Sequence, residues 1–450
     1  MDKDTMRTQI FLSIALFLGQ LMLVHSQEGN DTIVLHSVEE ALAYANEHNI
    51  EKAIHEYQQG KAKTEHQLSK SYLLPTATGS FSAQNNLKLA TTPIPGELVG
   101  QPGELVDVQF GQDYNYNAGI TISQTVLDWQ KIIKSRTAKV GRDIAEVQSD
   151  LFGEKLTEQI ALYYHTALIA KKALQINEKD FVIADSIRVL TKEKFDKGII
   201  DKSLLNHASI NLNAIEQSVF SNQSTLEKSL YQLKSLLGIA ASASLILDGD
   251  YEYSSQTFTI PKELAKDGNI TVLEYQLEQS RLKIKDEKSA YYPKLIFNAY
   301  FGQQQFQDDF TLSFDGEAWK DYSYLGMNLS VPIFTGNANR SRTKISKIEY
   351  AIAQKNLESE IQQSTLRDDL LLKEYELSLY TSTSTYDSFM LYSNNLELAF
   401  QKYQQGIIPL DSYFQVFEDY IRAENNYLNA LSNVYTYYST ILSRNNDNEE

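Results

Sequence analysis

Apolar residues recur at alternating spacings of three and four along the longest polar stretches of the chain. One such run is Ile160, Tyr163, Ala167, Ala170 and Leu174, and another is Phe389, Tyr392, Leu396, Ala399 and Tyr403. This period is typical of coiled-coil helices. Residues 130–197 contain no Pro, and residues 337–405 contain neither Gly nor Pro. The pattern therefore predicts two very long helices over these ranges, each ~100 Å long at about 1.5 Å per residue.

The same spacing continues over 201–237 and 409–444, which predicts a shorter helix after each long one. Gly198 and Gly406 stand where the long helices end, and glycine suits the left-handed residue that closes a helix. Pro409 suits the first turn of the helix that follows. Each half of the chain is thus predicted to form an antiparallel helical hairpin, with bends near 198–203 and 406–411.

Elsewhere the pattern changes to strict alternation, which is the period of a β-strand. Strands are predicted over about 76–84, 116–127, 294–303 and 324–334. Segments of about 9–11 alternating residues with aromatic residues at their ends are typical of membrane-spanning strands. Because a barrel needs about eight strands, four can cross a membrane only if several chains share one barrel, and three chains give twelve strands. A small soluble sheet is the alternative.

The chain also repeats itself. Phe195–Ile200 matches Tyr403–Ile408 in sequence, and Gly119–Leu127 matches Gly326–Phe334. A period of this size indicates a duplicated domain-sized unit rather than a solenoid. We therefore predict a signal peptide at 1–26, a first repeat at 27–237, an equatorial linker at 238–269, a second repeat at 270–445 and a short tail at 446–450.

The N-terminus and the composition narrow the class of protein. Lys3 and Arg7 flank the start of an apolar stretch that ends at Val24, and Val24 and Ser26 suit signal-peptide cleavage; an uncleaved anchor is the alternative. The sequence has no Cys, which excludes disulfides and Cys-ligated metals. Its net charge of -17 argues against a nucleic-acid partner. The composition holds only 20 Gly and 8 Pro, in keeping with long uninterrupted elements.

Candidate catalytic chemistry is sparse. His48, His55 and His66 would share one face of a single first helix, too far apart along it to chelate one metal, so we interpret them as surface residues. The sequence contains no His-Glu-x-x-His, Gly-x-x-x-x-Gly-Lys or Gly-x-Ser-x-Gly motif. We expect neither an enzyme nor a cofactor or metal.

Together these features resemble the TolC family of outer-membrane efflux and secretion channels. The resemblance rests on the duplicated half, on Ser330–Gly336 leading into a long helix, and on the twin aromatic-x-x-Gly-Ile-Ile turns. It implies a mostly α fold with a small β part: a homotrimer with a twelve-stranded transmembrane β-barrel in the outer membrane and an α-helical barrel of coiled-coil hairpins in the periplasm. It also implies a periplasmic adaptor, an inner-membrane transporter and a passive channel.

The resemblance assigns the two bends to the periplasmic tips. The residues implied in adaptor docking are Phe195, Gly198, Ile199, Tyr403, Gly406 and Ile407. Those implied in the gate are Tyr403, Ile408, Asp411, Ser412 and Gln415. The family's usual arginine falls on Ile408 and its acidic positions fall on Ser412 and Gln415. Closure is therefore expected to use hydrogen bonds and apolar contacts among Tyr403, Ile407, Ile408 and Asp411; plain helix termination is the simpler role for these bends.

A basic cluster opens both long helices, where positive charge opposes the helix dipole. Its residues are Lys134, Arg136, Lys139, Arg342, Lys344 and Lys347, with Lys131 and Arg340 beside them. We predict contact with lipid phosphates just below the membrane, against the alternative of a solvated helix face. The alternative for the whole chain is an exported periplasmic coiled-coil scaffold without channel activity. Drug efflux, metal efflux and type I secretion all remain open as transport functions.

Overall fold

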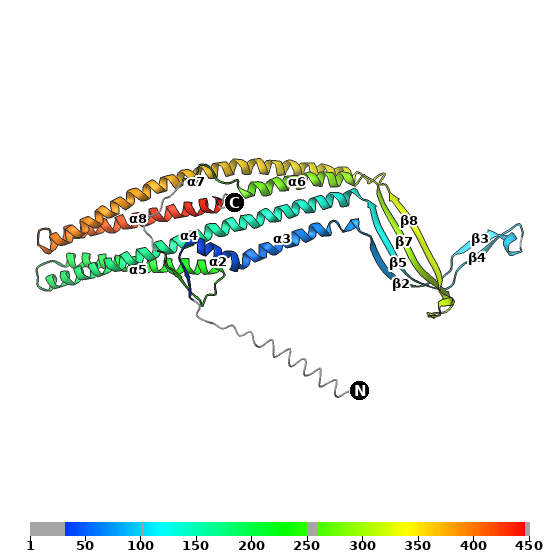
Figure 1. Ribbon diagram of the computed structural model, residues 1–450, viewed down its shortest axis with the longest axis horizontal. Coiled ribbons are helices and arrows are strands. Elements are labelled where there is room, and N and C mark those ends of the chain that lie inside the picture. The colour runs from blue at the N-terminus through cyan, green and yellow to red at the C-terminus, as the bar shows by residue number, and fades with distance from the viewer. Residues whose placement is uncertain (1–31, 101, 250–259, 446–450) are drawn as a thin grey trace, which may run out of the picture. The chain divides into compact units, whose positions relative to one another are not determined.

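A computed structural model describes residues 32–100, 102–249 and 260–445 (Figure 1). The predicted signal peptide and the C-terminal tail lie outside these residues. The chain divides into two compact units. The helical unit takes its described residues from Met1–Ile54, Phe152–Lys266 and Thr365–Glu450. The sheet unit consists of His55–Leu151 and Asp267–Ser364.

The helical unit is built from long helices and one short pair of strands. It contains α2 (Val38–His48), α5 (Lys202–Leu237), α8 (Leu410–Asn445), most of α4 (Trp129–Asp196) and the second part of α7 (Ala338–Gln404). Strand β1 (Thr32–Leu35) pairs in parallel with β6 (Ser244–Leu247). Apolar residues at the three–four spacing, such as Ile160, Leu233 and Val434, are fully buried in its cores. The coiled-coil pattern in the sequence therefore marks true core positions.

The sheet unit holds a four-stranded antiparallel sheet in the order β2-β5-β7-β8 (Figure 1). Its strands are β2 (Thr76–Asn85), β5 (Tyr114–Leu127), β7 (Lys294–Gln307) and β8 (Lys320–Ser330). The unit also contains α6 (Gly268–Ser289), most of α3 (Ile50–Leu68), the start of α4 and the first part of α7. Its described residues also form the 3₁₀ turns η1 (Ser71–Leu73), η2 (Gly96–Val99) and η4 (Gly316–Ala318).

Two local features differ from the sequence expectation. Between the first two predicted strands, where the sequence analysis placed no element, lies a hairpin of β3 (Thr91–Pro95) and β4 (Leu105–Gln109). The prediction of a single first helix is wrong, because Asn49 lies between the end of α2 and the start of α3. The Asn49 amide donates a hydrogen bond to the carbonyl of Leu236 at 2.7 Å, and its side-chain oxygen accepts from the amide of Lys52. The break separates His48 from His55 and His66, so the three do not share one helix.

The register of the sheet sorts its side chains onto two faces, because residues paired directly across an antiparallel ladder point the same way. Ile120 pairs with Phe301, and Phe297 pairs with Met327. One face is therefore mainly apolar: Ala77, Gly79, Phe81, Ile120, Ile122, Leu295, Phe297, Ala299, Phe301, Leu325, Met327 and Leu329. The opposite face is mainly polar: Thr76, Thr78, Ser80, Thr121, Ser123, Asn298, Tyr300, Tyr324, Asn328 and Ser330.

Candidate functional site

The two bends of the helical unit share one backbone geometry. Gly198 and Gly406 have φ angles of 71° and 73°, in the left-handed region that glycine enters freely. The amide of Ile199 donates to the carbonyl of Lys194 at 2.9 Å, and the amide of Ile407 donates to that of Lys402 at 2.9 Å. The glycine amides donate to the carbonyls three residues back. Both long helices therefore end in the same Schellman motif, and the glycines predicted at the bends have this structural role.

The helices that return from the bends begin differently. Asp201 caps α5, since its carboxylate accepts a hydrogen bond from the amide of Leu204 at 3.0 Å. At the second bend Pro409 precedes α8, and its carbonyl accepts from the amide of Tyr413. Asp411 lies in the first turn of α8, where a negative charge favours the helix dipole. The two tips thus share their turn but not their capping chemistry.

Tyr403 links the two tips. It is buried, and its hydroxyl accepts a hydrogen bond from the Lys194 ammonium at 2.8 Å. The same nitrogen lies 4.6 Å from the centre of the Tyr403 ring, a cation–π distance. The ring of Tyr413 packs 5.9 Å away. The tyrosine that the sequence assigned to the gate is therefore held by a lysine of the other tip.

The other predicted tip residues lie nearer the surface. Ile408 is half-buried and packs against the apolar core of the tip region, and Phe195 is half-buried. Ile199, Ile407, Asp411, Ser412 and Gln415 are exposed. The tip surface of the single chain therefore presents two isoleucines and a carboxylate.

A buried polar centre in the helical unit was missed by the sequence reasoning. Asp180 of α4 is 3% exposed and Glu424 of α8 is 1% exposed. The Tyr420 hydroxyl donates to Asp180 at 3.2 Å, and the Asn177 amide donates to Glu424 at 2.9 Å. Asn222 of α5 donates in turn to Asn177 at 2.8 Å. Three helices therefore contribute to one buried hydrogen-bond network.

The two carboxyl groups of this centre disfavour each other's ionisation. Burial raises the pKa of Glu424, and the neighbouring Asp180 raises it further. Burial also raises the pKa of Asp180, although hydrogen bonds from Glu424 and Tyr420 oppose the change. We infer that the pair shares a proton, held mainly on Glu424. A signal was present in the sequence: Asn177 and Asp180 stand at the three–four spacing between Ala173 and Ala184.

His165 occupies a second buried polar position, on α4. Its ring stacks on Tyr435 with centroids 4.0 Å apart and meets Tyr164 edge-on. Burial lowers the pKa of His165 to about 3, so the ring is neutral at physiological pH. This histidine therefore acts as an aromatic core residue.

The predicted basic cluster lies on exposed turns of α4 and α7 in the sheet unit. Lys134, Arg136, Lys139, Arg342, Lys344 and Lys347 are all exposed. Asp128 offsets the positive charge at the start of α4, because its carboxylate accepts from the amide of Gln130 at 3.0 Å.

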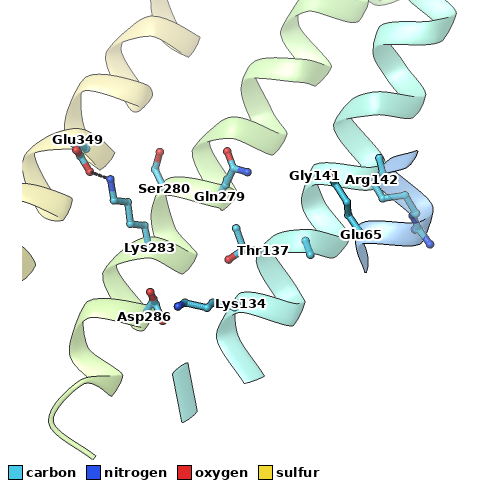
Figure 2. A pocket seen from close by; sticks show the side chains of 12 residues that line it. Glu65, Lys134, Thr137, Gly141, Arg142, Gln279, Ser280, Lys283, Asp286 and Glu349 are labelled. Atoms are coloured by element: carbon cyan, nitrogen blue, oxygen red, sulfur yellow. Dashed lines mark ion pairs between the residues drawn. The ribbon is translucent and has the colours of Figure 1, made fainter. Parts of the chain in front are cut away.

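Lys134 also lines a groove of about 690 Å³ formed by helices α3, α4, α6 and α7 of the sheet unit. Figure 2 shows Lys134 pointing toward Asp286. The Lys283 ammonium pairs with Glu349 at 2.8 Å. Burial raises the pKa of Asp286, and the charge of Lys134 opposes that rise. With acidic and basic side chains both on its walls, the groove has no net preference for anions or cations.

Two kinds of feature are not found among the described residues. Among residues 32–100, 102–249 and 260–445, no helix is long and apolar enough to cross a membrane. Within the same ranges no three His, Cys, Asp or Glu side chains come together as a metal site.

Comparison with known proteins gives consistent matches. Residues 259–443 match the family described as "Outer membrane efflux protein". The chain is 23% identical over 248 residues to "Outer membrane protein TolC" of Vibrio cholerae, a match that covers 54% of this chain and 56% of the relative. This chain therefore spans about half the length of the curated relative it matches.

Two solved structures extend the likeness in fold to almost the whole chain. The CmeC outer membrane channel of Campylobacter jejuni superposes with a TM-score of 0.75 at 16% identity, covering 90% of this chain and 85% of that one. The open state of the MtrE outer membrane channel of Neisseria gonorrhoeae gives 0.69 at 15% identity, covering 90% and 88%. The resemblance that the sequence indicated is confirmed, together with localisation to the outer membrane with an extension into the periplasm.

Proposed function

We infer that this protein is an outer-membrane channel, because its chain resembles the TolC-like outer-membrane efflux proteins in sequence and fold. It serves as the exit duct of a tripartite efflux pump or of a type I secretion system. The duct conducts its cargo passively, and the energy comes from an inner-membrane transporter reached through a periplasmic adaptor.

The observation that carries this proposal is the two-faced sheet. Leu325, Met327 and Leu329 project from its apolar face and are more than 60% exposed. Their opposite face carries Thr, Ser, Asn and Tyr side chains. An apolar outside and a polar inside is the arrangement of a membrane-spanning barrel wall. A soluble sheet needs a core on its apolar face.

The ends of the sheet favour a shared barrel. Strands β2 and β8 form its two edges within one chain, and open edges are not tolerated in lipid. Pairing β8 of one copy with β2 of the next closes a ring, and three copies give twelve strands. A head-to-tail contact of this kind closes by rotational symmetry.

Exposed apolar residues on the helices also support an assembly of three copies of the chain, a homotrimer. In the helical unit α7 presents a heptad stripe of exposed residues that includes Leu370, Leu377, Leu391 and Leu398. On α5 the exposed apolar residues are Ile210, Phe220 and Tyr231. Exposed apolar stripes of this extent indicate a protein interface. We assign them to neighbouring copies of the chain.

The two tips are proposed to dock the adaptor and to gate the channel. Gly198 and Gly406 fix the turns, and exposed Ile199 and Ile407 offer the apolar contact. The bond between Lys194 and Tyr403 is proposed to hold the two hairpins of one chain together in the closed state. Tyr403→Phe removes it, and in a planar bilayer the variant is expected to open more often than the unmodified channel.

The exposed basic cluster is proposed to meet lipid phosphates at the membrane surface. Arg136 and Lys139 on α4, and Arg342, Lys344 and Lys347 on α7, have exposed side chains that can reach such phosphates. Lys134 is also exposed, but it points toward Asp286 in this structure and would have to turn away from the groove. Each such charge near an anionic surface contributes about 1 kcal/mol.

The test is to express the full chain, fractionate the membranes and image the detergent-extracted particle. The channel proposal predicts outer-membrane fractionation, a threefold ring and ion conductance in a planar bilayer. A soluble monomer or filament in the periplasm would overturn it in favour of the coiled-coil scaffold. Cargo is then identified by co-purifying the adaptor and transporter.

A further inference from the structure

We propose that the helical unit binds a small organic cation, of the primary ammonium class, in a cavity between α4, α7 and α8 beside Asp180. The site lies within one chain and does not depend on the proposed channel function.

The cavity has a volume of about 300 Å³. Asp180 lines it from α4, Ser393 and Phe400 line it from α7, and Tyr413 and Tyr420 line it from α8. This volume lies at the lower end of the range of small-molecule sites. A ligand of the size of one ring and a short chain is therefore the class that fits.

The charge of the cavity favours a cation. Asp180 lines the cavity and interacts with Glu424, so two nearly fully buried carboxyl groups contribute negative charge beside it. The opposite charges of Lys179 and Glu397 stand at exposed positions on its rim. An anion would be repelled by the buried pair, whereas a cation would take the place of the proton that the pair shares.

The walls of the cavity add aromatic faces and a spare hydroxyl. The rings of Phe400 and Tyr413 lie 6.1 Å apart, and Tyr420 closes the wall beside Asp180. Tyr413 is 1% exposed, yet its hydroxyl has no hydrogen-bond partner among the residues that the structure describes. A buried polar group without a partner is unfavourable unless a ligand or water satisfies it.

These features select an ammonium ion over a bare metal ion. An ammonium group donates hydrogen bonds to the Asp180 carboxylate and to a tyrosine oxygen, and its positive charge is attracted to aromatic faces. A hard divalent cation needs six or more oxygen ligands close together. The cavity offers few oxygens spread over a larger, partly aromatic space.

The test uses the full chain in detergent and calorimetric titration with benzylammonium chloride as the probe. Benzyl alcohol, benzoate and calcium chloride are titrated in parallel. We expect one benzylammonium ion to bind per chain and the other three compounds not to bind. Asp180→Asn should weaken the affinity about tenfold or more, since it removes a charged hydrogen-bond partner. Glu418→Gln, at an exposed position on α8, should leave it unchanged.

A second measurement on the unmodified protein guards against a variant that fails to fold. The titratable groups that line the site are Lys179 and Asp180 on α4, Glu397 on α7, and Tyr413 and Tyr420 on α8. Glu424 on α8 interacts with Asp180. Because the cation competes with the shared proton, benzylammonium affinity should fall as the pH is lowered from 7.5 to 5.5. Absence of binding, equal binding of benzyl alcohol, preference for calcium, or affinity that is indifferent to both pH and Asp180→Asn would each overturn the proposal.

Discussion

The helical unit and the sheet of the other unit treat apolar side chains in opposite ways. In the helical unit Ile160, Leu233 and Val434 are completely buried within one chain. In the sheet Leu325 and Met327 are 69% and 73% exposed. The difference shows which contacts bury the apolar side chains in each part of the molecule. The cores of the helical unit gain this burial within one chain, whereas the proposed function assigns the burial of the sheet's apolar face to lipid and neighbouring copies.

This contrast also separates two uses of polar residues. The helical unit buries several of them, among them Asp180, which accepts a hydrogen bond from Tyr420, and Glu424, which accepts one from Asn177. The sheet lines a whole face with them. Changes in the helical unit should therefore alter the stability of a single chain, and changes in the sheet should alter assembly.

The largest effect is expected from Gly238→Ala at the end of α5. Gly238 has a φ of 71°, and an added Cβ would lie 2.3 Å from the carbonyl oxygen of His48. The left-handed conformation costs an alanine about 1–2 kcal/mol, and overpacking adds about 1–3 kcal/mol. We expect the free energy of unfolding, measured by circular dichroism in denaturant, to fall by about 3 kcal/mol.

Gly198→Ala is the matched control for that change. Gly198 has the same φ of 71° but no atom within 4 Å of an added Cβ. The free energy of unfolding of Gly198→Ala should fall only by the cost of the left-handed backbone conformation, about 1–2 kcal/mol. Equal losses in the two variants would show that the backbone at His48 accommodates the added methyl group of Gly238→Ala without further cost.

A smaller effect, of another kind, is expected from Gly119→Ala in β5. Gly119 pairs with Gly302, and the Tyr300 ring lies across both. An added Cβ would lie 2.5 Å from the Tyr300 hydroxyl and 2.9 Å from the Cα of Gly302. Relieving such overpacking costs about 1–3 kcal/mol. The yield of intact oligomer on a native gel should drop, while helix content stays unchanged.

Gly79→Ala in β2 tests whether the loss of oligomer in Gly119→Ala comes from the contact with Tyr300. Gly79 lies in the same sheet, and no atom lies within 4 Å of an added Cβ. Its oligomer yield should match that of the unmodified protein. If both variants lose the oligomer equally, the Tyr300 contact is not what maintains the register of the sheet.

The parts of the fold that the sequence predicts are those with local causes. Gly198 and Gly406 mark the ends of α4 and α7, because a left-handed helix end is a property of a few adjacent residues. The break at Asn49 was not predictable, since its amide bonds to Leu236, 187 residues away in sequence.

The same reasoning applies to the candidate sites. The sequence singled out Tyr403, but not Lys194, which approaches it from the other half of the chain. Asp180 and Glu424 resemble ordinary helix acids until α4 and α8 pack together. Pairings that depend on tertiary packing leave only an indirect signal in the sequence, here a polar residue at a core spacing.

The last prediction is a pH dependence of the stability of the helical unit. The pKa of Glu424 and that of Asp180 are raised in the folded chain, mainly by burial. These carboxyl groups ordinarily titrate at about pH 4. At pH values between about 4 and their raised pKa values, the folded chain binds more protons than the unfolded chain. The free energy of unfolding should therefore fall as the pH rises from about 4 through neutral pH.

Glu424→Gln assigns this dependence to the buried pair. Glutamine retains the shape and a hydrogen-bonding amide but does not ionise, so the slope of unfolding free energy against pH should flatten between about pH 5 and 8. Glu418→Gln, exposed on the same helix, should keep the full slope. A Glu424→Gln variant with an unchanged slope would place the pH dependence elsewhere. The pair would then be two ionised carboxylates whose repulsion is offset by the network of Asn177 and Tyr420 rather than by a shared proton.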